Sequence, residues 1–182
     1  MPHPAPSSLV APVDDDLAAA LEELEASDFA VAAHREDGVW HVAALSGRAQ
    51  DDLSALRTAL LQRPPHTAPL ALVAVDDDFW VAVRARGHQL SLLLSDVTAA
   101  LEWPIAREVL DALEEPLPDD DEPRPIGDLG LFSDLGLRRP EMVALCEDEE
   151  LYPDEVCLRV AGRLGFAPQL VRVLRAAGGP AF

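Results

Sequence analysis

Residues 70–96, which read LALVAVDDDFWVAVRARGHQLSLLLSD, decide the fold. Three apolar runs follow one another with short breaks, Asp76-Asp77-Asp78 between the first two and Gly87-His88 between the last two. In the middle run, residues 79–86, the side chains alternate between two faces, as expected of a strand within a sheet. Because breaks this short join antiparallel neighbours, the stretch predicts three consecutive antiparallel strands.

Two more strands are predicted upstream, where residues 28–45 read DFAVAAHREDGVWHVAAL. Asp37-Gly38 lies between two apolar runs, which is a strong hairpin signal. A helix is predicted in residues 50–63, where leucines recur at helical spacing before Pro64-Pro65 ends the run. Another is predicted to follow the three aspartates at 14–16, whose charges suit a helix N-terminus.

The predicted order is α-ββ-α-βββ-α, which indicates an α+β fold with a mostly antiparallel five-stranded sheet. This order of elements resembles that of roadblock and longin domains. Such a likeness concerns topology and implies no function.

The end of the three-strand stretch continues directly into an amphipathic run. Ser95 or Asp96 is suited to cap a helix that begins at Val97. Trp103 precedes proline and is therefore biased out of helical geometry, while Pro104 is suited to begin a second helix. We interpret the junction first as a strand, cap, helix and kink, with any ligand role placed at Asp96.

Composition divides the chain into four parts. Residues 1–13 are rich in Pro, Ala and Ser and predict a disordered N-terminal extension. Residues 14–113 form the predicted α+β domain. Residues 114–127 read EEPLPDDDEPRPIG and predict an acidic, proline-rich linker. Residues 128–178 predict a small helical C-terminal segment.

Charge constrains the partners. The chain has 33 acidic residues against 14 basic ones, and its formal net charge is −19. All of the basic residues are arginines, which excludes Schiff-base lysine chemistry and a P-loop. Such a charge repels phosphate backbones, so we expect protein partners and no direct contact with nucleic acid. The sequence also predicts no membrane segment or signal peptide, and hence a cytoplasmic protein.

Few side chains are candidates for chemistry. The carboxylates of Asp76, Asp77, Asp78 and Asp96 are weak candidates for a metal site, because antiparallel order brings them to one end of the sheet. The alternative is that these aspartates satisfy backbone N–H groups in turns and caps. His34-Arg35-Glu36 matches the H-x-E element of zinc-dependent nucleobase deaminases but lacks the accompanying P-C-x-x-C. We therefore predict no cofactor, no bound metal and no catalytic residue.

One face of the middle strand carries Trp80, Arg84 and Arg86, which are candidates for partner binding because Trp and Arg are frequent interface anchors. The alternative is that a second layer of helices covers this face and the arginine head groups reach solvent. The two arrangements fit the pattern equally well.

VDDDFWVAVR (75–84), LLLSDVTAALEWPIA (92–106) and LYPDEV (151–156) resemble the actinobacterial family of tRNA adenosine deaminase-associated proteins. The likeness extends from about Asp28 to Phe166. It implies a context of wobble-adenosine to inosine editing in tRNA and brings no catalytic residues with it. We therefore expect a non-enzymatic accessory protein that contacts the tRNA adenosine deaminase or a related factor.

Two alternatives come from other functional classes. The first is a metal- or small-ligand-dependent enzyme that uses the acidic strand ends. The second is a structural homo-oligomeric interaction module that associates through a sheet edge.

Overall fold

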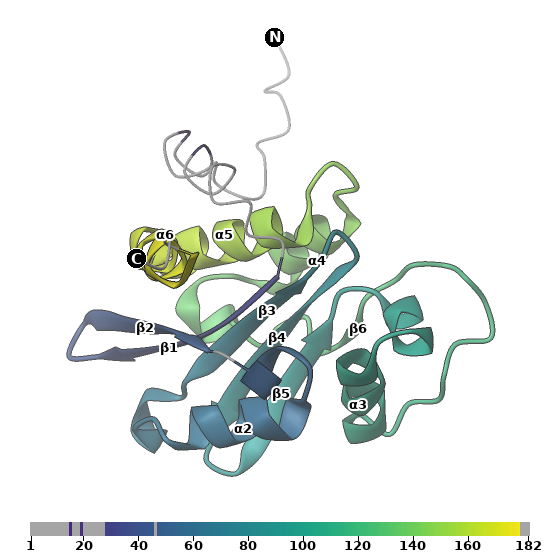
Figure 1. Cartoon of the computed structure of the whole chain (residues 1–182), viewed down its shortest axis with the longest axis horizontal. Helices are drawn as coiled ribbons and strands as arrows, with labels where there is room; N and C mark the ends of the chain where they lie inside the picture. The colour runs from purple at the N-terminus through teal and green to yellow at the C-terminus, as the bar shows by residue number, and fades with distance from the viewer. Residues whose placement is uncertain (1–14, 16–18, 20–27, 46, 179–182) are drawn as a thin grey trace, which may run out of the picture.

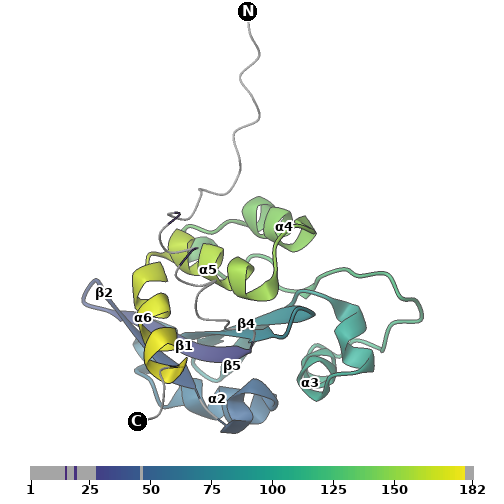
Figure 2. The same ribbon diagram turned by 45° about the horizontal axis from the view of Figure 1, so that its top comes forward.

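The structure, a computed structural model, describes residues 15, 19, 28–45 and 47–178 and contains a six-stranded antiparallel sheet with helices on both faces (Figures 1 and 2). The spatial order of the strands is β2-β1-β3-β4-β5-β6. The strands are β1 (Phe29–Glu36), β2 (Val39–Leu45), β3 (Leu70–Val75), β4 (Phe79–Arg86), β5 (Gln89–Leu94) and β6 (Ile126–Gly127). The α-helices are α2 (Leu53–Leu61), α3 (Pro104–Ala112), α4 (Arg139–Glu147), α5 (Pro153–Leu164) and α6 (Ala167–Gly178). The helix predicted after residues 14–16 lies almost wholly outside the described residues.

The α+β class and the antiparallel order are confirmed. In the first hairpin Asp37 and Gly38 have φ angles of 52° and 78°, as a two-residue turn that follows the twist of its strands requires. This turn pairs Glu36 with Val39 and His34 with His41. The three predicted strands in residues 70–96 are also present, and each pairs with the next.

The predicted strand number, five, is wrong by one. Ile126 and Gly127, the last two residues of the predicted linker, pair with Leu94 and Leu93 of β5. Gly127 permits this close approach, since its φ angle is 114° and a Cβ there would lie 2.1 Å from the carbonyl oxygen of Leu92. A stretch of two residues carries too little pattern for a strand prediction, because alternation needs about four residues to be recognised.

We expect Gly127→Ala to lower the free energy of unfolding by about 2–3 kcal/mol, because it combines a strained φ angle with a backbone clash. Gly136→Ala is a matched control, since Gly136 has a φ angle of 99° but no neighbouring atom within 4 Å of the position that its new methyl group would take. That control should cost only the strain, about 1 kcal/mol. Urea unfolding measures both, and equal losses would contradict a packed β6.

One face of the sheet packs against α2, α3 and the 3-10 helix η3 (Val97–Leu101). Asp96 caps η3, because its Oδ1 accepts hydrogen bonds from the Thr98 backbone N–H at 2.9 Å and from the Thr98 hydroxyl at 2.6 Å. The backbone of Trp103 is extended, and Pro104 is the first residue of α3. The predicted cap and kink are therefore confirmed, with a 3-10 helix as the first element after the cap.

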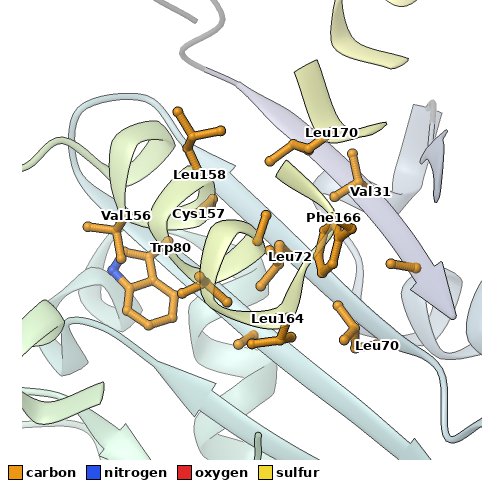
Figure 3. Packing of buried hydrophobic residues seen from close by; sticks show 14 of the residues in the cluster. Val31, Leu70, Leu72, Trp80, Val156, Cys157, Leu158, Leu164, Phe166 and Leu170 are labelled. Carbon is orange, nitrogen blue, oxygen red and sulfur yellow. The ribbon is translucent and has the colours of Figure 1, made fainter. Parts of the chain in front are cut away.

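The opposite face packs against α4, α5 and α6 (Figure 2). Trp80 of β4 lies beside Val156 and Cys157 of α5, and Phe166 lies between the helices and the sheet, as Figure 3 shows. Residues 128–178 thus share a hydrophobic core with the sheet. The molecule has three layers, and each face of the sheet carries its own apolar cluster.

Candidate functional site

The Asp76–Asp78 turn lies at the same end of the sheet as Ser95 and Asp96, which follow β5. The antiparallel order predicted this arrangement. Val75 pairs with Phe79 on either side of the Asp76–Asp78 turn. Next to it, the Trp80 backbone N–H donates to Ser95 Oγ at 2.9 Å, and the Ser95 N–H donates to the Trp80 carbonyl at 3.1 Å. These bonds hold Asp96 close to the turn.

Two shallow grooves meet at Asp78 and Asp96, with volumes of about 160 Å³ and 220 Å³. The smaller groove also has Asp77 and Asp148 in its wall, and the larger one has Asp121. We call the following six residues the acidic rim: Asp77, Asp78, Asp96, Asp121, Asp148 and Asp154. The first five line the grooves, and Asp154 lies near Asp77, whose charge acts on it. The six come from five segments of the chain: the β3–β4 turn, the cap of η3, the linker, the C-cap of α4 and the first turn of α5.

The acidic rim is electrostatically unbalanced. The arginine ion pairs among the described residues join other acids, at Asp120, Asp134 and Glu141, and none joins a residue of the rim. Burial raises the pKa of Asp154, and the negative charges of Glu155 and Asp77 raise it further. Arg124 is a nearby cation, but its guanidinium pairs with Asp120, which raises the pKa of Arg124, and the charge of Asp96 raises that pKa further. Six carboxylates beside one such cation leave an excess of negative charge that favours a cationic partner.

The rim does not form a compact metal site. Within residues 28–45 and 47–178, the group whose ligand atoms lie close enough together for one ion is His34, Glu36 and His41, at another place in the fold. Asp96 uses Oδ1 as a cap. The structure therefore brings Asp78 and Asp96 together in a groove without arranging Asp76, Asp77, Asp78 and Asp96 as ligands.

The thiol in the smaller groove is not activated. Burial raises the pKa of Cys146 to about 12, and the charge of Glu147 acts in the same direction. A thiol with so high a pKa carries almost no thiolate at neutral pH, and the thiolate is the nucleophile and the metal ligand. Cys146 and Cys157 are both free.

On the face of β4 that carries Trp80, Arg84 and Arg86, α5 covers Trp80, and Leu131 and Asp134 contact Arg84. Trp80 and Arg84 are each 3% exposed, whereas the Arg86 side chain is 55% exposed. Arg84 donates to both carboxylate oxygens of Asp134 at 3.0 and 3.1 Å. Of the two arrangements that the sequence left open, the covered one is seen, and a partner can reach Arg86 on this face while Trp80 and Arg84 are enclosed.

The spacing of histidines along the chain did not predict the histidine cluster of the β1–β2 hairpin, His34 and His41 with Glu36 beside them, because these histidines meet across the hairpin. The two-residue turn at Asp37-Gly38 already implies that His34 faces His41, and this is the signal that could have found the pair. Burial lowers the pKa of His34, and the charges of His41 and Arg63 lower it further.

No helix in the described part of the chain has the length and apolar character needed to cross a membrane.

Comparison with known proteins gives two matches. A family model described as "Rv3753c-like tRNA adenosine deaminase-associated protein" matches residues 28–167. Protein Rv3753c of Mycobacterium tuberculosis (strain ATCC 25618 / H37Rv) is 40% identical over 150 residues, which cover 80% of this chain and 87% of that protein. No solved structure matches.

Proposed function

The chain belongs to the family of Rv3753c-like tRNA adenosine deaminase-associated proteins, and from this premise we propose that it is a non-enzymatic accessory protein that binds a tRNA adenosine deaminase in the cytoplasm. The contact is between proteins, and its surface on this chain is the acidic rim. The observation that carries the proposal is the gathering around two grooves of carboxylates from four segments, with Asp154 of a fifth segment near Asp77. None of these carboxylates has an ion-pair partner among the described residues.

Charge complementarity supports this choice of partner. An enzyme that acts on tRNA must attract a polyanion, and it does so with arginine and lysine side chains. A chain with a net charge of −19 repels tRNA but is attracted to such a surface. The grooves also offer apolar atoms beside the carboxylates, from Leu151 and Val156 in one and Trp103 in the other, so that charge steers the encounter and burial of apolar surface sustains it.

The rim also argues against an enzyme. Acid–base catalysis needs groups with different pKa values that converge on one point, whereas the acids of the rim are spread around two grooves. Cys146, the thiol in the smaller groove, is no nucleophile at neutral pH, because its pKa is raised to about 12. A metal-dependent enzyme at Asp76–Asp78 and Asp96 would need a set of converging ligands, which the arrangement at this end does not supply.

A second candidate function has one specific observation in its favour. β2 is the first strand in the sheet order, so one of its edges has no neighbouring strand among the described residues. Free edges are where two copies of a chain can pair. Light scattering of the purified chain tests this homo-oligomeric alternative directly.

Charge reversal on the rim tests the main proposal. We expect Asp77→Lys together with Asp121→Lys to weaken binding to the deaminase at least about tenfold at physiological salt, since both residues are exposed and their charges face the partner. Affinity is measured with the purified proteins by calorimetry or biolayer interferometry. Co-purification of the wild type with the deaminase is the first step.

Asp51→Lys together with Asp111→Lys is the matched control, because both aspartates are exposed, outside the rim, and change the net charge equally. This control should bind within about twofold of wild type. If both double variants weaken binding equally, the effect comes from the net charge of the chain and not from the acidic rim. Failure to recover the deaminase with the wild type, with unchanged tRNA editing after deletion, would contradict the accessory role.

A further inference from the structure

A cluster of histidines and a glutamate lies on the β1–β2 hairpin, well separated in the sequence from the acidic rim. His34 of β1 is directly opposite His41 of β2. Their rings are stacked, with centroids 5.0 Å apart and planes inclined by 18°. Glu36 lies two residues beyond His34 and therefore projects from the same face of the strand. One ligand atom from each of these three residues lies within 4.8 Å of the others.

A third imidazole lies beside Glu36, on another element. His66 belongs to the 3-10 helix η2 (Pro65–Thr67), and its Nε2 is 3.7 Å from Glu36 Oε1. The His66 side chain is 72% exposed and that of Glu36 is 39% exposed. The cluster thus joins the hairpin to the segment that follows α2, and its outer side opens to solvent.

One nitrogen of the cluster is buried without a partner. His34 Nδ1 is inaccessible to solvent and makes no hydrogen bond with any part of the chain that the structure describes. A buried polar atom without a partner is destabilising and calls for an explanation. A metal ion bound at this nitrogen would supply its missing partner.

We propose that His34, Glu36 and His41, with His66 as the fourth ligand, form a Zn²⁺ site. Imidazole nitrogen and carboxylate oxygen are ligands that Zn²⁺ takes at about 2.0–2.2 Å, usually in tetrahedral geometry. Donor atoms around such an ion are roughly 3.3 Å apart, whereas those of the three residues lie up to 4.8 Å apart, so the side chains close in by up to about 1.5 Å through rotation of their χ angles. The same rotation opens the stack of His34 and His41, because the lone pair of an imidazole nitrogen lies in the plane of its ring. A set with three imidazoles favours Zn²⁺ over Mg²⁺ and Ca²⁺, which take oxygen ligands.

Arg63 is a nearby cation, and its charge acts on His34. Its guanidinium donates to the Ala59 carbonyl at 2.8 Å, which turns it toward the C-terminal end of α2. The carboxylate of Glu36 offsets this charge and would be the anionic ligand of the ion.

Zinc binding to the full chain, stripped of metal with a chelator, tests the proposal. We expect one equivalent of Zn²⁺ to bind and, at about 100-fold excess over Kd, to raise Tm by roughly 5–10 °C, whereas Mg²⁺ and Ca²⁺ leave Tm unchanged. In the NMR spectrum the side-chain nitrogen resonances of His34 and His41 should shift on binding.

The variants His34→Gln and His41→Gln should each weaken Zn²⁺ binding by at least about tenfold. Loss of a residue that only hydrogen-bonds to a metal ligand already weakens binding about 10- to 100-fold, and loss of a ligand itself should cost no less. His88→Gln is the matched control, since His88 lies in the exposed β4–β5 turn outside the cluster and should bind as wild type does. Circular dichroism of the metal-free variants establishes that they are folded. No binding by the wild type, or equal binding by folded His34→Gln and His41→Gln, would overturn the proposal.

Discussion

Asp134→Ala is expected to lower the free energy of unfolding by about 2 kcal/mol, which is less than the loss of a fully buried ion pair costs, because the Asp134 side chain is 48% exposed and solvent screens it. The reason is the guanidinium that it leaves behind. Arg84 is 3% exposed, and it donates to both oxygens of Asp134, to the Ala68 carbonyl at 2.7 Å and to the Leu131 carbonyl at 3.3 Å. Without Asp134 a buried positive charge keeps only neutral partners. Urea unfolding measures the loss.

Two further variants separate charge from packing. Arg86→Met removes the other cation that bonds Asp134, at 3.0 Å, but its side chain is 55% exposed, so the cost should stay below about 1 kcal/mol. The double variant Arg84→Met, Asp134→Ala removes the buried charge together with its partner and should be no less stable than Asp134→Ala alone. A double variant that is clearly less stable would show that Arg84 stabilises the fold by its other bonds.

Phe166→Ala is expected to cost about 3–5 kcal/mol, as removal of a fully buried aromatic ring does. Phe166 is 0% exposed and its ring centroid lies 4.8 Å from that of Trp40 on β2. It follows Gly165, whose φ angle of 106° ends α5 and turns the chain into α6. The ring therefore anchors both helices on the sheet (Figure 3). Differential scanning calorimetry should show Tm lowered by about 10 °C.

The shape of that transition is as informative as its midpoint. Because residues 128–178 and the sheet share one core, we expect a single cooperative transition in wild type and variant. Leu117→Ala is the control, since Leu117 is 47% exposed and should change stability by no more than about 0.5 kcal/mol. Two separate transitions in Phe166→Ala, with the sheet melting at its wild-type temperature, would contradict the shared core.

The sequence alone predicted the elements that depend on neighbouring residues. The Asp37-Gly38 turn, the strands of residues 70–96, the cap at Asp96 and the helix that Pro104 begins are all local. Each follows from backbone preferences or from the period of apolar side chains, which act over a few residues. The convergence of Asp78 and Asp96 at one end of the sheet followed from the antiparallel order.

The tertiary structure decided everything that joins distant segments. Whether Trp80 and Arg84 meet a partner or the chain itself depended on where residues 128–178 pack, which no pattern within β4 reveals. The acidic rim draws Asp121 and Asp148 from beyond the sheet, and the histidine cluster draws His66 from η2 to the hairpin. Local preferences specify strands, turns and caps because they act over a few bonds. Which surfaces meet is decided by the burial of apolar area over the whole chain, and sites built between segments follow from that burial.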